Sequence, residues 1–156
     1  MGTVARDVMD TKFHLLSPET SIAEAVRLFK EAGEREGRRL FGMMVVDGEG
    51  SLAGTLSMYD ILLVVRPKHI HIWGEMDDLD VTGLVDASCE RVRSLLVGDI
   101  MTTDVTTITA DTHLFMIVDI MLKKHIRRLP VVEDGKILGI VYISDVFYHL
   151  LDRFVA

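Results

Sequence analysis

The chain has 156 residues, and its 17 Lys and Arg against 24 Asp and Glu leave a net charge of −7. This acidic balance argues against nucleic acid as a partner, because a polyphosphate is repelled everywhere except at a locally basic patch. The single cysteine, Cys89, cannot form an internal disulfide, which is typical of a reducing compartment. Unbroken apolar runs such as 61–65 are far shorter than the ~20 residues of a membrane span, and the first residues lack a basic-then-apolar signal pattern. These features predict a soluble, acidic, cytoplasmic protein that does not enter a membrane.

The sequence contains an internal repeat, whose offset changes from 92 to 85 residues along the chain. The alignment pairs Asp7-Val8-Met9 with Asp99-Ile100-Met101, Gly54 with Gly139 and Asp60 with Asp145. The change in offset places insertions in the first copy at 34–39 and in the turn 47–50, because loops tolerate added residues. We therefore expect a first repeat at 3–65, a connecting segment at 66–96 and a second repeat at 97–154.

The first repeat predicts a strand, a helix, a hairpin and a second helix. Their ranges are 13–16, from 22 onward, 43–47 with 52–57, and 58–65. Ser21-Ile22-Ala23-Glu24 is a capping box, and the spacing of Ile22, Val26 and Phe29 predicts one apolar helix face.

The second repeat predicts the same order of elements. Their ranges are 105–108, 114–122, 129–133 with 137–142, and 144–154. Asp134-Gly135 between β-branched runs indicates a tight hairpin, and the helix at 114–122 is apolar nearly all round, which predicts that it is well buried. Each copy is therefore a β-α-β-β-α unit of a three-stranded sheet covered on one face by two helices. The fold class is α+β, and two such small units should pack together.

The connecting segment should contain an amphipathic helix. Val85, Cys89, Val92 and Leu96 recur at helical spacing, so we expect them to face the first repeat. Cys89 is then expected to be a buried small apolar residue rather than a redox sensor.

The candidate chemistry lies where the second hairpin strand of the first repeat ends. Gly54 permits a close backbone approach, and Ser57 stands where a strand leads into a helix whose free amides can meet a phosphate. Asp60 follows in the first helical turn, where a carboxylate can accept both hydroxyls of a ribose. The alternative is that Ser57 and Asp60 only cap the helix. The recurrence of Gly139 and Asp145 favours the ligand interpretation, because capping alone does not require the glycine.

This tandem of units resembles the paired CBS domain, the cystathionine β-synthase-type repeat whose pairs are called Bateman modules. Each copy begins Asp-Val/Ile-Met and the first closes Gly-x-x-Ser-x-x-Asp, while the second carries the phrase Ile126-Arg127-Arg128-Leu129-Pro130-Val131-Val132. The resemblance implies two pseudo-symmetric repeats packed sheet to sheet. It also implies two clefts between them that take AMP, ADP, ATP or, in some members, S-adenosylmethionine.

Carried over to this sequence, the resemblance implies a first cleft with a carboxylate for ribose, a hydroxyl and a guanidinium for phosphate, and an apolar wall for the base. Its residues are Thr55, Ser57, Asp60, Val105, Thr106, Arg128 and Pro130. Arg127 either assists with phosphate or is a solvated charge.

The second cleft is implied to be weaker. Its residues are Phe13, His14, Ile140, Tyr142 and Asp145. Tyr142 stands at the hydroxyl position, Gly42 lies in the stretch aligned with the arginine phrase, and Arg38 and Arg39 are displaced upstream. A ligand without a phosphate, such as S-adenosylmethionine, suits this cleft better than a nucleotide.

We therefore expect a regulatory module that senses adenosine nucleotides, needs no cofactor or metal, catalyses nothing itself and acts on an unidentified protein partner. The family resemblance also implies a homodimer. One alternative is a ligand-free dimerisation or interaction module. Another is a small metal-dependent hydrolase that uses His69 and His71, although no further ligands stand at a recognisable spacing, and the acidic run 75–80 is typical of a solvated loop.

Overall fold

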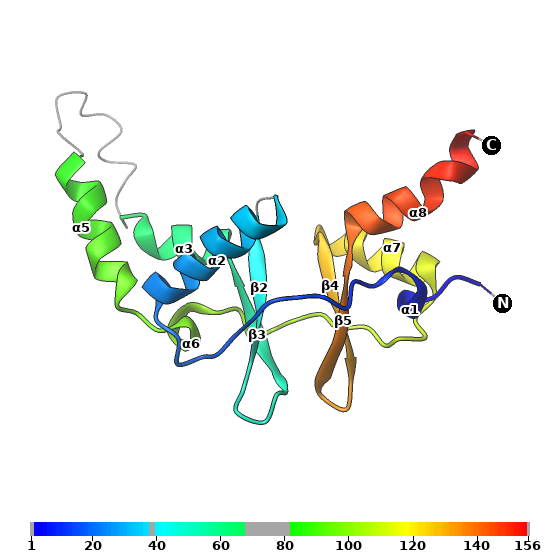
Figure 1. Cartoon of the computed structure of the whole chain (residues 1–156), viewed down its shortest axis with the longest axis horizontal. Helices are drawn as coiled ribbons and strands as arrows, with labels where there is room; N and C mark the ends of the chain where they lie inside the picture. The colour runs from blue at the N-terminus through cyan, green and yellow to red at the C-terminus, as the bar shows by residue number, and fades with distance from the viewer. Residues whose placement is uncertain (1, 38–39, 68–81, 156) are drawn as a thin grey trace. The chain divides into compact units, whose positions relative to one another are not determined.

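The computed structural model describes residues 2–37, 40–67 and 82–155, which fold into two units (Figure 1). The first-repeat unit contains Leu15–Glu49 and Ala53–Thr103. The second-repeat unit contains Met1–His14, Gly50–Leu52 and Asp104–Ala156. Of the helices in the described ranges, none is long and apolar enough to cross a bilayer.

The first-repeat unit is a small sheet with helices. Its elements are β1 (Leu15–Leu16), α2 (Ile22–Glu36), β2 (Gly42–Val46), β3 (Leu52–Ser57), α3 (Met58–Val65), α5 (Thr82–Arg93) and α6 (Val97–Ile100). The strand order is β1-β2-β3, with β1 parallel to β2. The core contains Leu16, Ile22, Ala25, Ala32, Met43, Val45, Leu56, Val92 and Val97.

The second-repeat unit is built on an antiparallel hairpin. Its elements are α1 (Ala5–Val8), α7 (Leu114–Lys124), β4 (Arg128–Glu133), β5 (Lys136–Tyr142) and α8 (Ile143–Val155). Asp134 and Gly135 have φ of 51° and 80°, as a tight Asp-Gly turn requires. The core contains Ala5, Ile108, Leu114, Ile117, Met121, Leu129, Val131, Val141 and Val146.

The predicted α+β class, both hairpins and the helix after each hairpin are confirmed. The Ser21 hydroxyl caps α2 by accepting a bond from the Glu24 N–H at 3.2 Å, as predicted. The predicted strand at 105–108 is reduced to a single parallel bridge, because Ile108 alone pairs with β4, through Pro130 and Val132.

Two predictions of helix burial are wrong in part. In α2, Ile22 is buried and Phe29 packs against the core as predicted, but Val26 is exposed and Ala25 and Ala32 are the other buried residues. In α7, only Leu114, Ile117 and Met121 are buried, and the helix is not enclosed as expected. Val118 and Ile120 are partly buried against the same core, whereas Phe115, Met116 and Leu122 are exposed, Phe115 to 75%. The cause is that α7 presents one stripe, at spacings of three and four residues, to the core.

The helix predicted in the connecting segment is confirmed as α5, but Cys89 is exposed rather than buried. Val92 is the buried residue of this helix, and Val85 is 56% exposed. At about 100° per residue, the position four before Val92 lies closer to its face than the position three before it. That position is Ser88, which is half-buried, so the inward stripe is rotated by one residue from the predicted one.

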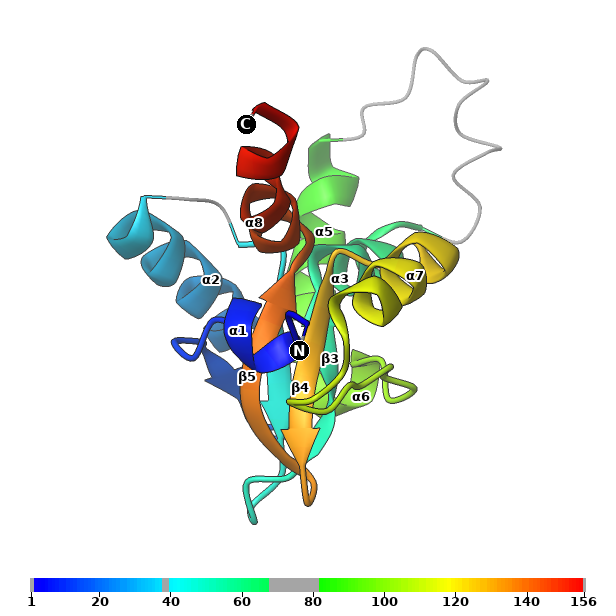
Figure 2. The same ribbon diagram turned by 90° about the vertical axis from the view of Figure 1, so that its right-hand side faces the viewer.

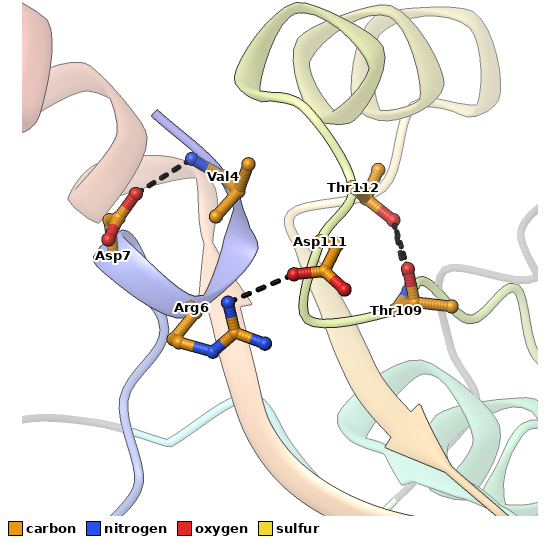
Figure 3. Close-up of polar contacts among 6 residues, drawn as sticks. All are labelled: Val4, Arg6, Asp7, Thr109, Asp111 and Thr112. Carbon is orange, nitrogen blue, oxygen red and sulfur yellow. Dashed lines mark hydrogen bonds and ion pairs between the residues drawn. The ribbon is translucent and has the colours of Figure 1, made fainter. Parts of the chain in front are cut away.

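Each repeat begins with a leading segment, residues 5–10 in the first repeat and 97–102 in the second. Each leading segment packs on the unit that contains the other repeat. In Figures 1 and 2, α1 lies next to β5 and the start of α8. The Ala5 N–H donates to the Thr112 carbonyl at 2.9 Å, and the Arg6 guanidinium contacts the Asp111 carboxylate at 2.9 Å (Figure 3). In the first-repeat unit, the Val97 N–H donates to the Thr20 carbonyl at 2.8 Å. These backbone bonds are related by the same shift of 92 residues as the sequences.

The leading segments continue into a pair of backbone bonds with each hairpin. Thr102 and Thr55 exchange two N–H···O=C bonds of 2.9 Å, and Asp10 and Ile140 exchange bonds of 2.8 and 2.9 Å. At Gly54, an added Cβ would lie 2.5 Å from the Thr102 carbonyl oxygen. Gly139 faces Met9 and Asp10 in the same way. The close approach predicted for these glycines is therefore made by the protein's own leading segment.

We predict that Gly54→Ala destabilises the protein by about 1–3 kcal/mol, because the new methyl group must displace backbone. Gly48→Ala is the matched control, since a Cβ there meets nothing within 4 Å. It should leave stability unchanged or raise it by up to about 1 kcal/mol. Urea unfolding measures the stability of both variants. Equal midpoints would contradict the close approach of the Thr102 backbone to Gly54.

Candidate functional site

Ser57 and Asp60 stand together at the junction of β3 and α3. The Ser57 hydroxyl accepts a bond from the Asp60 N–H at 3.1 Å, and the Ser57 N–H donates to Oδ2 of Asp60 at 2.9 Å. The Ser57 hydroxyl also donates to Oδ2 at 3.0 Å. This is a complete capping box, so the capping interpretation of these residues holds in the structure.

A third residue joins this pair. The Thr102 hydroxyl donates to Oδ1 of Asp60 at 3.0 Å, from the leading segment that is paired with Thr55. Thr102 was not predicted from the sequence, because the repeat alignment places its segment in the second repeat. The sequence did hold a signal for this contact. Met9-Asp10 and Met101-Thr102 recur at the offset of 92, and Gly54 and Gly139 also recur, so each repeat has both a leading segment and a glycine that can receive one.

The predicted first-cleft residues divide between the two units. Thr55, Ser57 and Asp60 lie in the first-repeat unit, and the other four lie in the second-repeat unit. Arg128 and Pro130 alternate along β4 with Leu129 and Val131, which belong to the core of their unit; Arg128 is half-buried and Pro130 is fully buried. The described half-sites are thus a hydroxyl–carboxylate cluster at one strand end and an arginine with an apolar neighbour on one strand face.

The predicted second-cleft residues all belong to the second-repeat unit. They are Phe13, His14, Ile140, Tyr142 and Asp145. Tyr142 lies opposite Arg128 in the hairpin, and Ile140 lies opposite Pro130, so these four residues share one face. Asp145 is exposed in the first turn of α8. The position equivalent to Thr102 is Asp10, whose Oδ1 accepts a bond from the Lys12 N–H at 2.8 Å.

The residues considered for a metal lie outside the described ranges, as do Arg38 and Arg39. They are His69, His71 and the acidic run 75–80. Within the described ranges, no three His, Cys, Asp or Glu side chains are grouped so that they could hold a metal ion.

A family model for the CBS domain matches the chain twice, at residues 5–67 and 97–152. An uncharacterized 17.7 kDa protein of Acidianus ambivalens is 29% identical over 153 residues, which cover 97% of this chain and 76% of that protein. The chloroplastic CBS domain-containing protein CBSX1 of Arabidopsis thaliana is 32% identical over 136 residues, covering 82% of this chain. The chain spans only 55% of the length of that plant relative.

Solved structures agree with these matches. CBSX2 from Arabidopsis thaliana, a CBS-pair protein, superposes with a TM-score of 0.76 at 26% identity, covering 100% of this chain and 99% of CBSX2. A structure of CBSX2 in complex with AMP gives a TM-score of 0.72 over 98% of this chain and 99% of that one. The resemblance inferred from the motifs is confirmed, and the chain belongs to the CBS-domain family, with two repeats in tandem.

Proposed function

We propose that this chain is a regulatory module that binds an adenosine nucleotide and acts on a protein partner without catalysis of its own. One observation carries the proposal: the Ser57 hydroxyl and the Asp60 carboxylate lie together at the start of α3. The chain that holds them is 26% identical to CBSX2, which has a structure in complex with AMP. The carboxylate suits a ribose, and the helix amides beside Ser57 suit a phosphate.

The remaining first-cleft residues supply what the first-repeat unit lacks. The chain carries a net charge of −7, so an anionic ligand needs a local cation, and Arg128 is assigned to the phosphate. Val105, Thr106 and Pro130 are assigned to the wall beside the base, and Thr55 of the first-repeat unit completes the proposed set. A ligand that contacts residues of both repeats favours one arrangement of the repeats over others, and this shift is what a partner would sense.

A second candidate function is self-association or docking without a ligand. Its support is a set of exposed apolar side chains on α8, which are Phe147, Tyr148, Phe154 and Val155. Thermal unfolding with and without AMP separates the two functions, because only a ligand-binding module is stabilised by the nucleotide. Native mass spectrometry reports the oligomeric state and any co-purified ligand in the same measurement.

Replacing Asp60 by Ala should abolish most AMP binding, because a hydrogen bond to a charged group contributes about 1.5–3 kcal/mol. The matched control is Asp99→Ala. Asp99 caps α6 in the same way, with Oδ2 accepting from the Leu96 N–H at 3.0 Å, but has no proposed ligand. Asp60→Ala should cost more stability than Asp99→Ala, because Asp60 also accepts from the Ser57 and Thr102 hydroxyls, but only Asp60→Ala should lose AMP in calorimetry. Unchanged AMP affinity in Asp60→Ala would refute the ribose assignment.

Arg128→Ala should weaken AMP about ten- to hundredfold and leave adenosine unchanged, because a guanidinium contacts only the phosphate. Arg127→Ala tests the neighbouring arginine, which is exposed and precedes the strand. AMP affinity should change by less than about threefold if the charge of Arg127 is only solvated, and by more if Arg127 assists with the phosphate. Parallel losses of adenosine and AMP in Arg128→Ala would mean that Arg128 acts through packing instead.

One AMP should bind per chain at modest concentration, because the second set of residues has Tyr142 where the first has Ser57. Losing the phosphate contacts should weaken that site about thirty- to several-hundredfold. Asp145→Ala should therefore have little effect on the AMP isotherm. Two equivalent AMP molecules per chain, or a large loss in Asp145→Ala, would reverse the assignment.

A further inference from the structure

The Asp60 carboxylate already accepts three hydrogen bonds within the protein. Its Oδ2 accepts from the Ser57 N–H at 2.9 Å and from the Ser57 hydroxyl at 3.0 Å. Its Oδ1 accepts from the Thr102 hydroxyl at 3.0 Å. A carboxylate offers about four acceptor positions, so about one remains, on Oδ1.

A ribose presents two neighbouring hydroxyls, and both can donate to Asp60 only if one of these bonds breaks. The Ser57 N–H is backbone at the start of α3 and cannot turn away. The Ser57 hydroxyl is held by the Asp60 N–H at 3.1 Å. Thr102 is exposed, and rotation of its side chain about χ1 releases Oδ1 without moving the backbone that is paired with Thr55.

We infer that Thr102 is a positioning residue that competes with the ribose for Oδ1 of Asp60. This inference rests on the proposed function of the site. The Thr102 hydroxyl holds the carboxylate in place when no ligand is bound and must leave when a vicinal diol binds. It therefore lowers affinity for a ribonucleotide, and it reduces the preference for ribose over a sugar with a single hydroxyl.

The second-repeat unit offers an internal comparison. Asp10 pairs with Ile140 as Thr102 pairs with Thr55, so the two side chains occupy equivalent positions. The equivalent bond in this unit would run from residue 10 to Asp145. An ionised carboxylate has no proton to donate, so Asp10 cannot donate to Asp145 as Thr102 donates to Asp60. The competition is a property of the first repeat alone and does not follow from the shared fold.

The test compares the full chain with its Thr102→Val variant, using AMP and 2′-deoxy-AMP as probes in calorimetry. Valine keeps the branched shape and removes the donor. AMP should bind about tenfold more tightly to Thr102→Val, equivalent to about 1.4 kcal/mol. The affinity for 2′-deoxy-AMP should change little, because its single hydroxyl fits the acceptor position that is already open. Thr102→Ser should behave as the original chain, and Thr103→Val controls for the change in the leading segment.

Each other outcome contradicts the inference. Equal AMP affinity in Thr102→Val and the original chain means that the hydroxyl does not compete, and weaker AMP binding means that it assists. An equal gain for AMP and 2′-deoxy-AMP means that the effect does not pass through the diol. Thr102→Ala repeats the measurement if thermal unfolding shows that the valine variant is unstable. If neither the original chain nor any variant binds AMP, the proposed function itself is wrong and the inference is wrong with it.

Discussion

The paired backbone bonds between Thr55 and Thr102, repeated between Ile140 and Asp10, connect each hairpin to the segment that leads into the other repeat. Each pair depends on a glycine, because a Cβ at Gly54 would lie 2.5 Å from the Thr102 carbonyl oxygen. The bonds that anchor α1 and α6 follow from the same exchange. The placement of Thr102 beside Asp60, and with it the chemistry of the candidate site, follows from it as well.

Local features of the fold could be predicted because they depend on neighbouring residues. The Ser21 cap, the Asp134-Gly135 turn and the limits of α3 are all set within a few positions. The exposed side of α7 and the inward stripe of α5 could not, because apolar periodicity does not say how much of a helix its neighbours cover. The exchange of leading segments between the repeats could not be predicted either. A repeat in the sequence does not show which hairpin each leading segment pairs with.

The candidate site shows the same division. Ser57 and Asp60 were identified because a strand end, a glycine and a first-turn acid stand close in sequence. Thr102 lies 42 residues from Asp60 and was missed. The recurrence of the glycines was interpreted as favouring a ligand, whereas the structure gives them a packing role against Met101 and Met9. The case for a ligand therefore depends on the carboxylate, the hydroxyls and Arg128, and no longer on the glycines.

The exchanged segments bear on how a tandem protein of this kind can arise. A single repeat contains both a leading segment and a hairpin strand that can receive one. In this structure, each leading segment pairs with the hairpin of the other repeat. Two separate copies of one repeat would form the pairings seen here by donating their leading segments to each other, to an extent set by their concentration. Joining the copies in one chain makes the same exchange intramolecular, where a tether supplies an effective concentration in the millimolar range. Gene fusion would thus convert a concentration-dependent dimer into a protein whose pairing no longer responds to dilution.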